Sequence, residues 1–220
     1  MTDVGHGSGD SILLQLSHPD VARPALLCGI TSLPSHHRRS RERVDSFLSS
    51  ADAPSETPDV ILFEGDAIWR PGNQDHPLSP FFQHDFDNVV ALDCALHFNT
   101  RQEFLYQAFQ RLAPGGRVAL ADICFSAPPG QVLTLLLWRV LHVMPRDNIV
   151  TKEQYMQQMN KIGYEDVEME DVTPFVFPGF RNFLKQRGYV GGVFAWFMGR
   201  LQEQGLRFII IKGTKPPLVQ

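Results

Sequence analysis

The sequence predicts an α/β fold in which a mostly parallel β-sheet is covered by helices on both faces. Apolar runs alternate with amphipathic helical periods along the chain. The runs are almost continuously apolar, which is typical of parallel strands buried on both faces. A glycine-rich turn, DVGHGSG, joins the first run to the first helical period. Such a turn lets a ligand approach the backbone closely.

Seven strands are expected in this sheet. The first four residues can form only the end of a strand, because the glycine turn follows at once. The other strands are expected at residues 25–30, 59–66, 86–93, 117–125, 164–172 and 206–214. The run at 164–172, YEDVEMEDV, alternates polar and apolar residues as a strand does.

Four helices are expected between these strands, at residues 11–16, 35–48, within 101–116 and at 151–162. The third is the clearest, because its apolar positions 104, 105, 108, 109 and 112 form one stripe. The sequence Pro114-Gly115-Gly116 is expected to stop this helix. The fourth helix begins with a capping residue, Thr151.

Two apolar, helix-prone segments, 128–144 and 174–204, do not belong to the alternating core. Both would leave from the end of the sheet where ligands bind in such folds, so they are interpreted as a lid. The chain is therefore predicted to be a single domain, residues 1–220, with a core of 1–127, 145–173 and 205–215.

The composition excludes several classes of protein. Hydrophobic residues make up 43% and charged residues 20% of the chain, which is ordinary for a soluble globular protein. A net charge of −4 gives no reason to expect a nucleic-acid partner. Cys28, Cys94 and Cys124 form no C-x-x-C pair, which indicates buried free thiols and no metal site. With no signal peptide or membrane span evident, the protein is expected to be cytoplasmic.

The spacing of the glycines narrows the choice of ligand. Dinucleotide-binding turns read G-x-G-x-x-G, whereas the third glycine here, Gly9, comes one residue early. Asp10 would also repel phosphate at the start of the first helix. A cationic or zwitterionic ligand fits this turn better, and a nicotinamide-dependent oxidoreductase is the less favoured alternative.

The turn D-x-G-x-G-x-G at the end of a first strand resembles motif I of the class I S-adenosylmethionine-dependent methyltransferases. Further landmarks follow in family order: CGITSLPSHHRRSRERV resembles the ribose-binding region, EGDA the adenine-binding turn, and FDNVVALDCALHF the strand and loop beneath the cofactor. FLYQAFQRLAPGGRVALADI resembles the family's fourth helix through fifth strand. The resemblance covers residues 1 to about 125 and a final strand pair. It implies a Rossmann-like seven-stranded sheet with an antiparallel last strand.

The resemblance also implies that S-adenosyl-L-methionine is the cofactor. The positions carried over as cofactor-binding are Asp3, Gly5, His6, Gly7, Thr31, Ser32, Gly65, Asp66, Ala67, Asp93, Cys94 and Leu96. Gly5 and Gly7 would pass beneath the methionine part, while Asp3 would support the turn or meet the amino group. Asp66 would accept a hydrogen bond from the adenine N6. Thr31 or Ser32 stands where the family usually carries a ribose-binding acid.

The remaining members of this set lie on the loop after the fourth strand. Asp93 and Cys94 would offer backbone groups to the cofactor, and Leu96 an apolar contact. In methyl transfer the enzyme mainly aligns and desolvates the reactants, and a general base is needed only when the acceptor must lose a proton. His97 is the candidate catalytic base, and the alternative is a histidine that only satisfies loop backbone groups. Asp122 would either approach the acceptor or only fix the loop.

The segment 174–204 is crowded with aromatic residues, which at helical spacing are more often core than a binding surface. Gly188, Gly191 and Gly192 nevertheless favour a mobile cover. Together with VLTLLLWRVLHVM at 132–144, the segment would line an apolar pocket. The expected acceptor is a small hydrophobic molecule: a lipid, sterol, quinone or secondary metabolite.

Further partners stay open. Four basic residues beside aromatic ones would allow peripheral membrane contact: Arg139, Arg181, Lys185 and Arg187. Members of this family usually carry cap helices before motif I, so the expectation is a shortened form, or one whose lid segments, homodimer partner or other partner chain replace the cap. Weaker cofactor binding is then expected. A non-catalytic interaction module with a methyltransferase fold is the alternative function.

Overall fold

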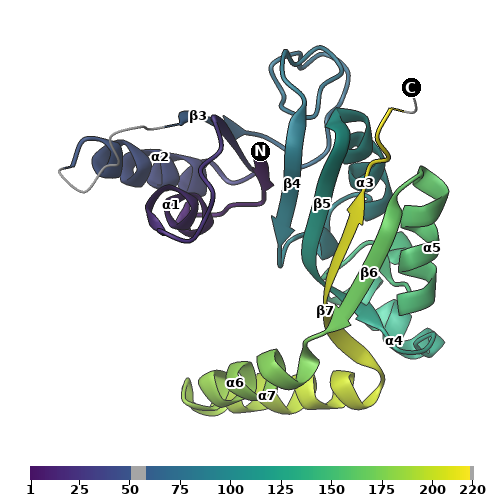
Figure 1. The fold of residues 1–220 in the computed structure, drawn as a ribbon. Coiled ribbons are helices and arrows are strands. Elements are labelled where there is room, and N and C mark those ends of the chain that lie inside the picture. Colours follow the sequence, from purple (N-terminus) through teal and green to yellow (C-terminus); the bar gives the residue numbers. More distant parts are fainter. Residues whose placement is uncertain (51–57, 219–220) are drawn as a thin grey trace.

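The computed structural model describes residues 1–50 and 58–218, and its centre is a twisted seven-stranded sheet (Figure 1). The strands are β1 (Thr2–Val4), β2 (Leu26–Thr31), β3 (Asp59–Glu64), β4 (Phe86–Leu92), β5 (Leu112–Phe125), β6 (Glu165–Asp171) and β7 (Leu206–Thr214). Their order across the sheet is β3-β2-β1-β4-β5-β7-β6. The first five strands are parallel, and β7 runs antiparallel to both β5 and β6. The predicted fold class is confirmed.

Helices pack on opposite faces of the sheet because successive side chains of a strand point to opposite sides. The connecting helices are α1 (Asp10–Ser17), α2 (Pro34–Leu48), α3 (Arg101–Arg111) and α5 (Lys152–Ile162). In β2, Leu27 packs with α1 and α2, whereas its neighbour Cys28 joins the cluster that includes α3 and α5. On β7 the face opposite α5 is less covered, and Ile210 there is 43% exposed.

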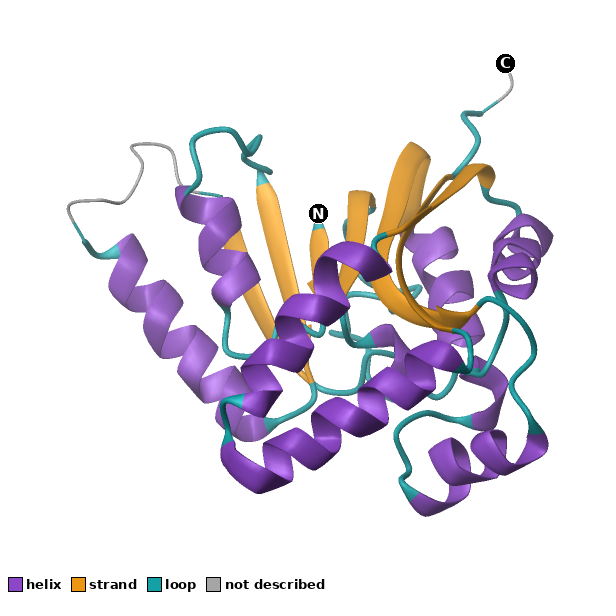
Figure 2. Cartoon of the chain, turned by 90° about the horizontal axis from the view of Figure 1, so that it is seen from below, coloured by secondary structure: helices purple, strands orange, loops and turns teal. Residues whose placement is uncertain are grey.

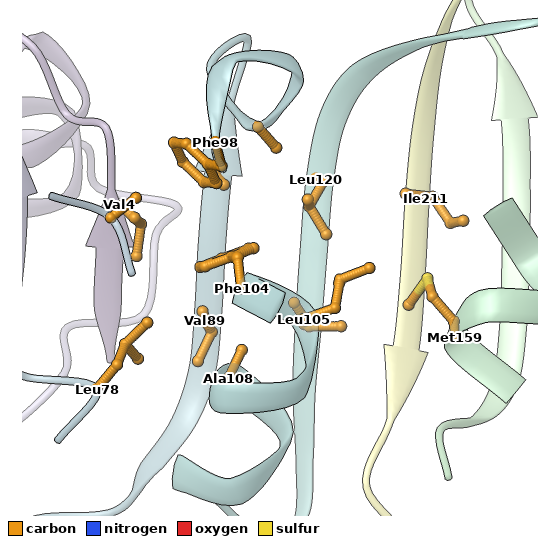
Figure 3. Close-up of a cluster of buried hydrophobic side chains, with 14 of the residues drawn as sticks. Val4, Leu78, Val89, Phe98, Phe104, Leu105, Ala108, Leu120, Met159 and Ile211 are labelled. Carbon is orange, nitrogen blue, oxygen red and sulfur yellow. The ribbon is translucent and has the colours of Figure 1, made fainter. Parts of the chain in front are cut away.

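The main hydrophobic core lies between the sheet and α3 (Figure 3). Phe104 and Leu105 of α3 are fully buried beside Val89 of β4 and Leu120 of β5. Farther along the sheet, Met159 of α5 lies beside β7 (Figure 3). The apolar stripe expected on the third helix therefore forms this interface, and its burial contributes most of the attraction between helix and sheet.

The predicted end of α3 is wrong by a few residues. The helix ends at Arg111, and Leu112 already has extended backbone and pairs with Phe86 of β4. The register of β4 and β5 then shifts, and Gly115 within the irregularity has a φ of 80°. The Pro-Gly-Gly sequence thus forms a bulge inside β5. It does not terminate the helix, because Leu112 already belongs to the sheet through its pairing with Phe86.

The two segments interpreted as a lid lie beyond the carboxyl ends of the parallel strands (Figure 1). They hold α4 (Gln131–Leu135) with the π-helix η2 (Leu136–Val140), and α6 (Thr173–Lys185) with α7 (Gly188–Glu203). Figure 2 shows α6 and α7 side by side across this end of the sheet. A Cβ at Gly191 would lie 2.1 Å from the Leu184 carbonyl oxygen, so this glycine permits the close approach of the two helices.

Within residues 1–50 and 58–218, no helix is long and apolar enough to cross a membrane. Two short 3₁₀ helices, η1 (Ala95–His97) and η3 (Arg146–Asn148), complete the fold. The first follows β4 directly, and the second precedes α5.

Candidate functional site

A cleft of about 460 Å³ lies at the carboxyl ends of β1, β2, β3 and β4. Its lining residues come from the turns after these four strands and from the start of α2: Gly5, Gly7, Ile30, Thr31, Ser32, Leu33, His36, Gly65, Asp66, Ala67, Cys94, His97, Phe98 and Asn99. In open α/β sheets, ligands bind at this edge. Nine residues assigned from the sequence are thereby brought together from four separate loops.

The glycine turn after β1 forms the floor of the cleft. The backbone N–H groups of Gly5 and His6 both donate to the Ile30 carbonyl, at 2.8 and 3.3 Å, and so fix the turn against β2. Gly5 has a φ of 85°, and a Cβ there would lie only 2.4 Å from Cys94 Sγ. The Cys94 thiol in turn donates to the Val4 carbonyl at 3.1 Å. Only glycine fits this close approach of two loops.

Asp3 lies beneath the turn, 1% exposed, and among the residues that the structure describes neither of its carboxylate oxygens has a hydrogen-bond partner of good geometry, the Ser11 hydroxyl being the nearby donor. Burial raises the pKa of this carboxyl to about 6, with Ser11 opposing the shift. The Asp3 charge also helps to raise the pKa of the half-buried Cys94 thiol, which lines the cleft. A buried carboxylate without a partner is costly, so its position favours a ligand that brings a cation or donor.

The Glu64–Ala67 turn is held by a histidine from the following loop. Asp66 Oδ1 accepts from the Ile68 N–H at 2.8 Å, while the Asp66 carbonyl accepts from His76 Nε2 at 2.9 Å. His76 Nδ1 accepts from the Leu78 N–H, so the ring hydrogen is on Nε2. Burial lowers the pKa of His76, which keeps the imidazole neutral. His76 lies in the connection between β3 and β4, for which the sequence predicts no helix or strand, and no local pattern marks it as a site residue.

Four of the assigned residues do not line the cleft: Asp3, His6, Asp93 and Leu96. His6 is buried behind the turn, where a Cβ at Gly29 would lie 2.7 Å from its ring, and burial lowers its pKa to about 4. Leu96 is buried in η1. Conversely, His36 of α2 is not among the positions carried over from the family, and it lines the cleft near Gly7. Its position in the first turn of a helix that starts beside the cleft is the sequence signal for it.

Asp10 does not cap α1, since the N-terminal cap is Gly9, which has no side chain that could accept a hydrogen bond. Instead, Asp10 is exposed and pairs with Arg43 of α2 at 2.7 Å. Arg43 also donates to the Ser8 carbonyl at 2.8 Å. This pair ties the glycine turn to α2 and offsets the negative charge at the helix start.

A second cavity, of about 480 Å³, lies beside the cleft and is almost entirely apolar. Its lining residues come from the β4 and β5 ends, both lid segments and β7: Asp93, Ile123, Leu137, Leu141, Val143, Val176, Phe177, Phe180, Phe194, Phe197, Met198, Leu201 and Phe208. The structure thus brings the segments 128–144 and 174–204 together around one space. Such hydrophobic lining is typical of small-molecule pockets.

The cleft and the cavity meet at the loop after β4. Cys94 and His97 line the cleft, whereas Asp93 lines the apolar cavity. His97 Nδ1 lies 2.7 Å from the carbonyl oxygen of Val143, a residue of the cavity wall. A carbonyl can only accept, so Nδ1 carries the hydrogen and Nε2 keeps its lone pair. His97 is therefore held between the two spaces in a tautomer that can take up a proton.

Asp122 is fully buried and lines neither the cleft nor the cavity. Its Oδ2 accepts from Arg101 Nη1 at 2.7 Å and from the Tyr155 hydroxyl at 3.0 Å. The Arg101 guanidinium also lies 4.1 Å from the centre of the Tyr155 ring. Of the two roles considered for Asp122, direct approach to an acceptor is wrong, because the carboxylate is enclosed by a buried ion pair.

The buried ion pair supports the loop that carries His97. Arg101 Nη2 donates to the Asn148 carbonyl at 2.7 Å, and the Arg101 N–H donates to Asn148 Oδ1 at 2.9 Å. The Asn148 amide then donates to the carbonyls of Leu96 and Phe98 at 3.0 and 2.7 Å. His97 stands between these two residues, so the network fixes the backbone on both sides of it.

Known proteins are similar to this chain in sequence and in fold. The chain is 30% identical over 228 residues to the erythromycin 3''-O-methyltransferase of Saccharopolyspora erythraea, covering 98% of the chain and 68% of that protein. The chain belongs to the S-adenosylmethionine-dependent methyltransferases. It is also 26% identical to the 27-O-demethylrifamycin SV methyltransferase of Amycolatopsis mediterranei, covering 82% of the chain and 59% of that protein. No protein-family model matches the chain.

The fold of this methyltransferase is shared with solved structures. Phosphoethanolamine N-methyltransferase 2 of Haemonchus contortus, in complex with S-adenosyl-L-methionine, superposes with a TM-score of 0.68 at 18% identity. The match covers 98% of the chain and 48% of that protein, so the chain spans about half of its length. S-Adenosylmethionine is the cofactor of this family, and the relatives act on secondary metabolites and other small molecules.

Proposed function

We propose that the chain transfers a methyl group from S-adenosylmethionine to a hydroxyl oxygen of a small hydrophobic acceptor, such as an apolar secondary metabolite. The observation that carries this proposal is the junction at His97 of a glycine-floored cleft and an apolar cavity. The relative at 30% identity is named as an O-methyltransferase, which supports oxygen as the methylated atom.

Two features of the cleft suit the cofactor. Asp3 offers a buried, unpartnered carboxylate near the turn, and a cationic amino group would satisfy it. At Gly5 the missing side chain makes room for Cys94, and both residues line the cleft. Asp66 and Ala67 would hold the adenine, and Thr31, Ser32 and His36 line the same cleft. Bound there, S-adenosylmethionine would supply a methyl group on a positively charged sulfur.

The chain's own residues then have three tasks. His97 Nε2 would accept the proton of the acceptor hydroxyl as its oxygen forms the new bond to carbon. The Val143 carbonyl keeps His97 in the required tautomer. Side chains from the two lid segments, among them Leu137 and Phe197, would exclude water from the reacting groups.

Substituting Gly5 tests the cleft. In Gly5→Ala, the new Cβ would meet Cys94 Sγ at 2.4 Å and Cβ at 2.8 Å, so the turn or the Cys94 loop must move. We expect the affinity for S-adenosylhomocysteine, measured by calorimetry, to fall at least about tenfold. Gly115→Ala is the matched control, because Gly115 has a similar φ of 80° and no atom within 4 Å of its Cβ position.

The outcomes of this titration separate the proposal from its alternative. Equal affinity in Gly5→Ala and Gly115→Ala would place the cofactor elsewhere. If the unaltered chain binds neither S-adenosylmethionine nor S-adenosylhomocysteine at millimolar concentration, methyl transfer by this chain is excluded. The non-catalytic interaction module then becomes the better account.

Cofactor affinity is expected to depend on pH through Asp3. The pKa of Asp3 is raised to about 6, so the carboxylate is mostly ionised at pH 7 and mostly protonated at pH 5. A cationic amino group is attracted to the ionised form only. Calorimetry should therefore show S-adenosylhomocysteine binding about tenfold more weakly at pH 5 than at pH 7. Asp3→Asn should remove most of this dependence, and a flat profile in the unaltered chain would leave Asp3 only a role in supporting the turn.

A further inference from the structure

Asp93 stands out in the wall of the apolar cavity. Every other side chain that lines the cavity is a hydrocarbon or a thioether. Asp93 follows β4 immediately, and its N–H donates to the Ala121 carbonyl of β5 at 2.7 Å. One carboxylate is thus presented to a space that is otherwise built for apolar molecules.

The backbone of Asp93 has a left-handed conformation, which sets the direction of its side chain relative to that of Cys94. Its φ of 54° lies in the left-handed region, which residues other than glycine adopt at a cost. The next residue, Cys94, lines the cofactor cleft. The left-handed turn therefore separates two neighbouring side chains, one for each space.

The surroundings of the Asp93 carboxylate shift its pKa. Burial raises the pKa of Asp93, Asp122 adds to this effect through its charge, and His97 opposes it. Asp93 is itself exposed, so its carboxylate stands at the open side of the apolar cavity. A ligand that enters the cavity displaces water from this carboxylate, and a ligand that donates a hydrogen bond to it offsets that loss.

From this geometry we propose that Asp93 selects the acceptor. The cavity takes an apolar molecule that carries a hydrogen-bond donor, a hydroxyl or an amine, and the donor binds the Asp93 carboxylate. Molecules that present a carboxylate at the same place are excluded by like charge. This inference rests on the proposed function only in taking the bound molecule as the methyl acceptor. Binding to the cavity itself can be tested without cofactor.

The test uses three probes of one chain length: octan-1-ol, octylamine and octanoate. Each is titrated at pH 8 into the cofactor-free protein, and binding is measured from the rise in Tm with ligand concentration. We expect octan-1-ol and octylamine to bind at least about tenfold more tightly than octanoate. In Asp93→Asn, octanoate should come within about threefold of octan-1-ol.

Asparagine suits this test because it tolerates left-handed backbone and preserves the turn. The matched control is Asp87→Asn, an exposed aspartate of β4, the strand that Asp93 follows, and it does not line the cavity. It should discriminate as the unaltered chain does. The inference is overturned if octanoate binds as well as octan-1-ol, if Asp93→Asn leaves the discrimination unchanged, or if none of the three probes raises Tm.

These outcomes are independent of the cofactor titration. Loss of discrimination with S-adenosylhomocysteine binding intact would remove only the role of Asp93. Absence of cofactor binding with discrimination intact would remove the proposed methyl transfer and leave a selective apolar binding site.

Discussion

His97→Asn is expected to lower the turnover of an alcohol acceptor by about 10²- to 10⁴-fold, the usual contribution of a general base. An asparagine amide can still donate to the Val143 carbonyl, which His97 Nδ1 now does at 2.7 Å. It has no lone pair of comparable basicity in the place of Nε2. The variant therefore removes the proton acceptor and keeps the contact that positions the loop.

The measurement is transfer of radiolabelled methyl to an alcohol that the unaltered chain methylates, together with calorimetry of S-adenosylhomocysteine. Cofactor affinity should stay within about threefold, since His97 would act on the acceptor. His84→Asn, an exposed histidine outside both spaces, serves as the control. If His97→Asn retains turnover within a few-fold, the imidazole only satisfies loop backbone groups.

Arg101→Met is expected to destabilise the protein by about 3–5 kcal/mol, the usual cost of leaving one partner of a buried ion pair without the other. Arg101 and Asp122 are 1% and 0% exposed, and their atoms lie 2.7 Å apart. Removal of the guanidinium also removes its hydrogen bond to the Asn148 carbonyl. Urea unfolding followed by circular dichroism gives the free energy of unfolding directly.

Two further variants make this result specific. Arg43→Met breaks the exposed pair with Asp10 and should cause a far smaller loss, because solvent screens that pair. Adding Asp122→Leu to Arg101→Met removes the stranded charge and should restore part of the stability. Equal losses of unfolding free energy in Arg43→Met and Arg101→Met would show that burial adds nothing to the cost of breaking the Arg101–Asp122 pair.

Local sequence patterns predicted most of the sheet and its helices. The stripe on α3 and the apolar runs of the parallel strands follow from short-range periodicity, so their positions could be read directly. The end of α3 could not be read in this way, because Leu112 pairs with Phe86, which comes from another part of the chain. Strand pairing of this kind overrides the local signal.

The site was predictable where a turn follows a strand. Gly5, Asp66 and Cys94 line one cleft because parallel strands place their ends at one edge. The separation of Asp93 from Cys94 depends on one left-handed residue, and the orientation of His97 depends on a carbonyl 46 positions away. Neither has a signature in local sequence.

The position of β7 between β5 and β6 affects how the protein is made. During synthesis on the ribosome, β5 and β6 emerge before their common neighbour, and they cannot join one sheet until Leu206–Thr214 has been translated. Until then their backbone edges remain unpaired and can engage other nascent chains. We therefore expect the yield of folded protein in cells to respond to chaperone supply more strongly than its equilibrium stability would suggest.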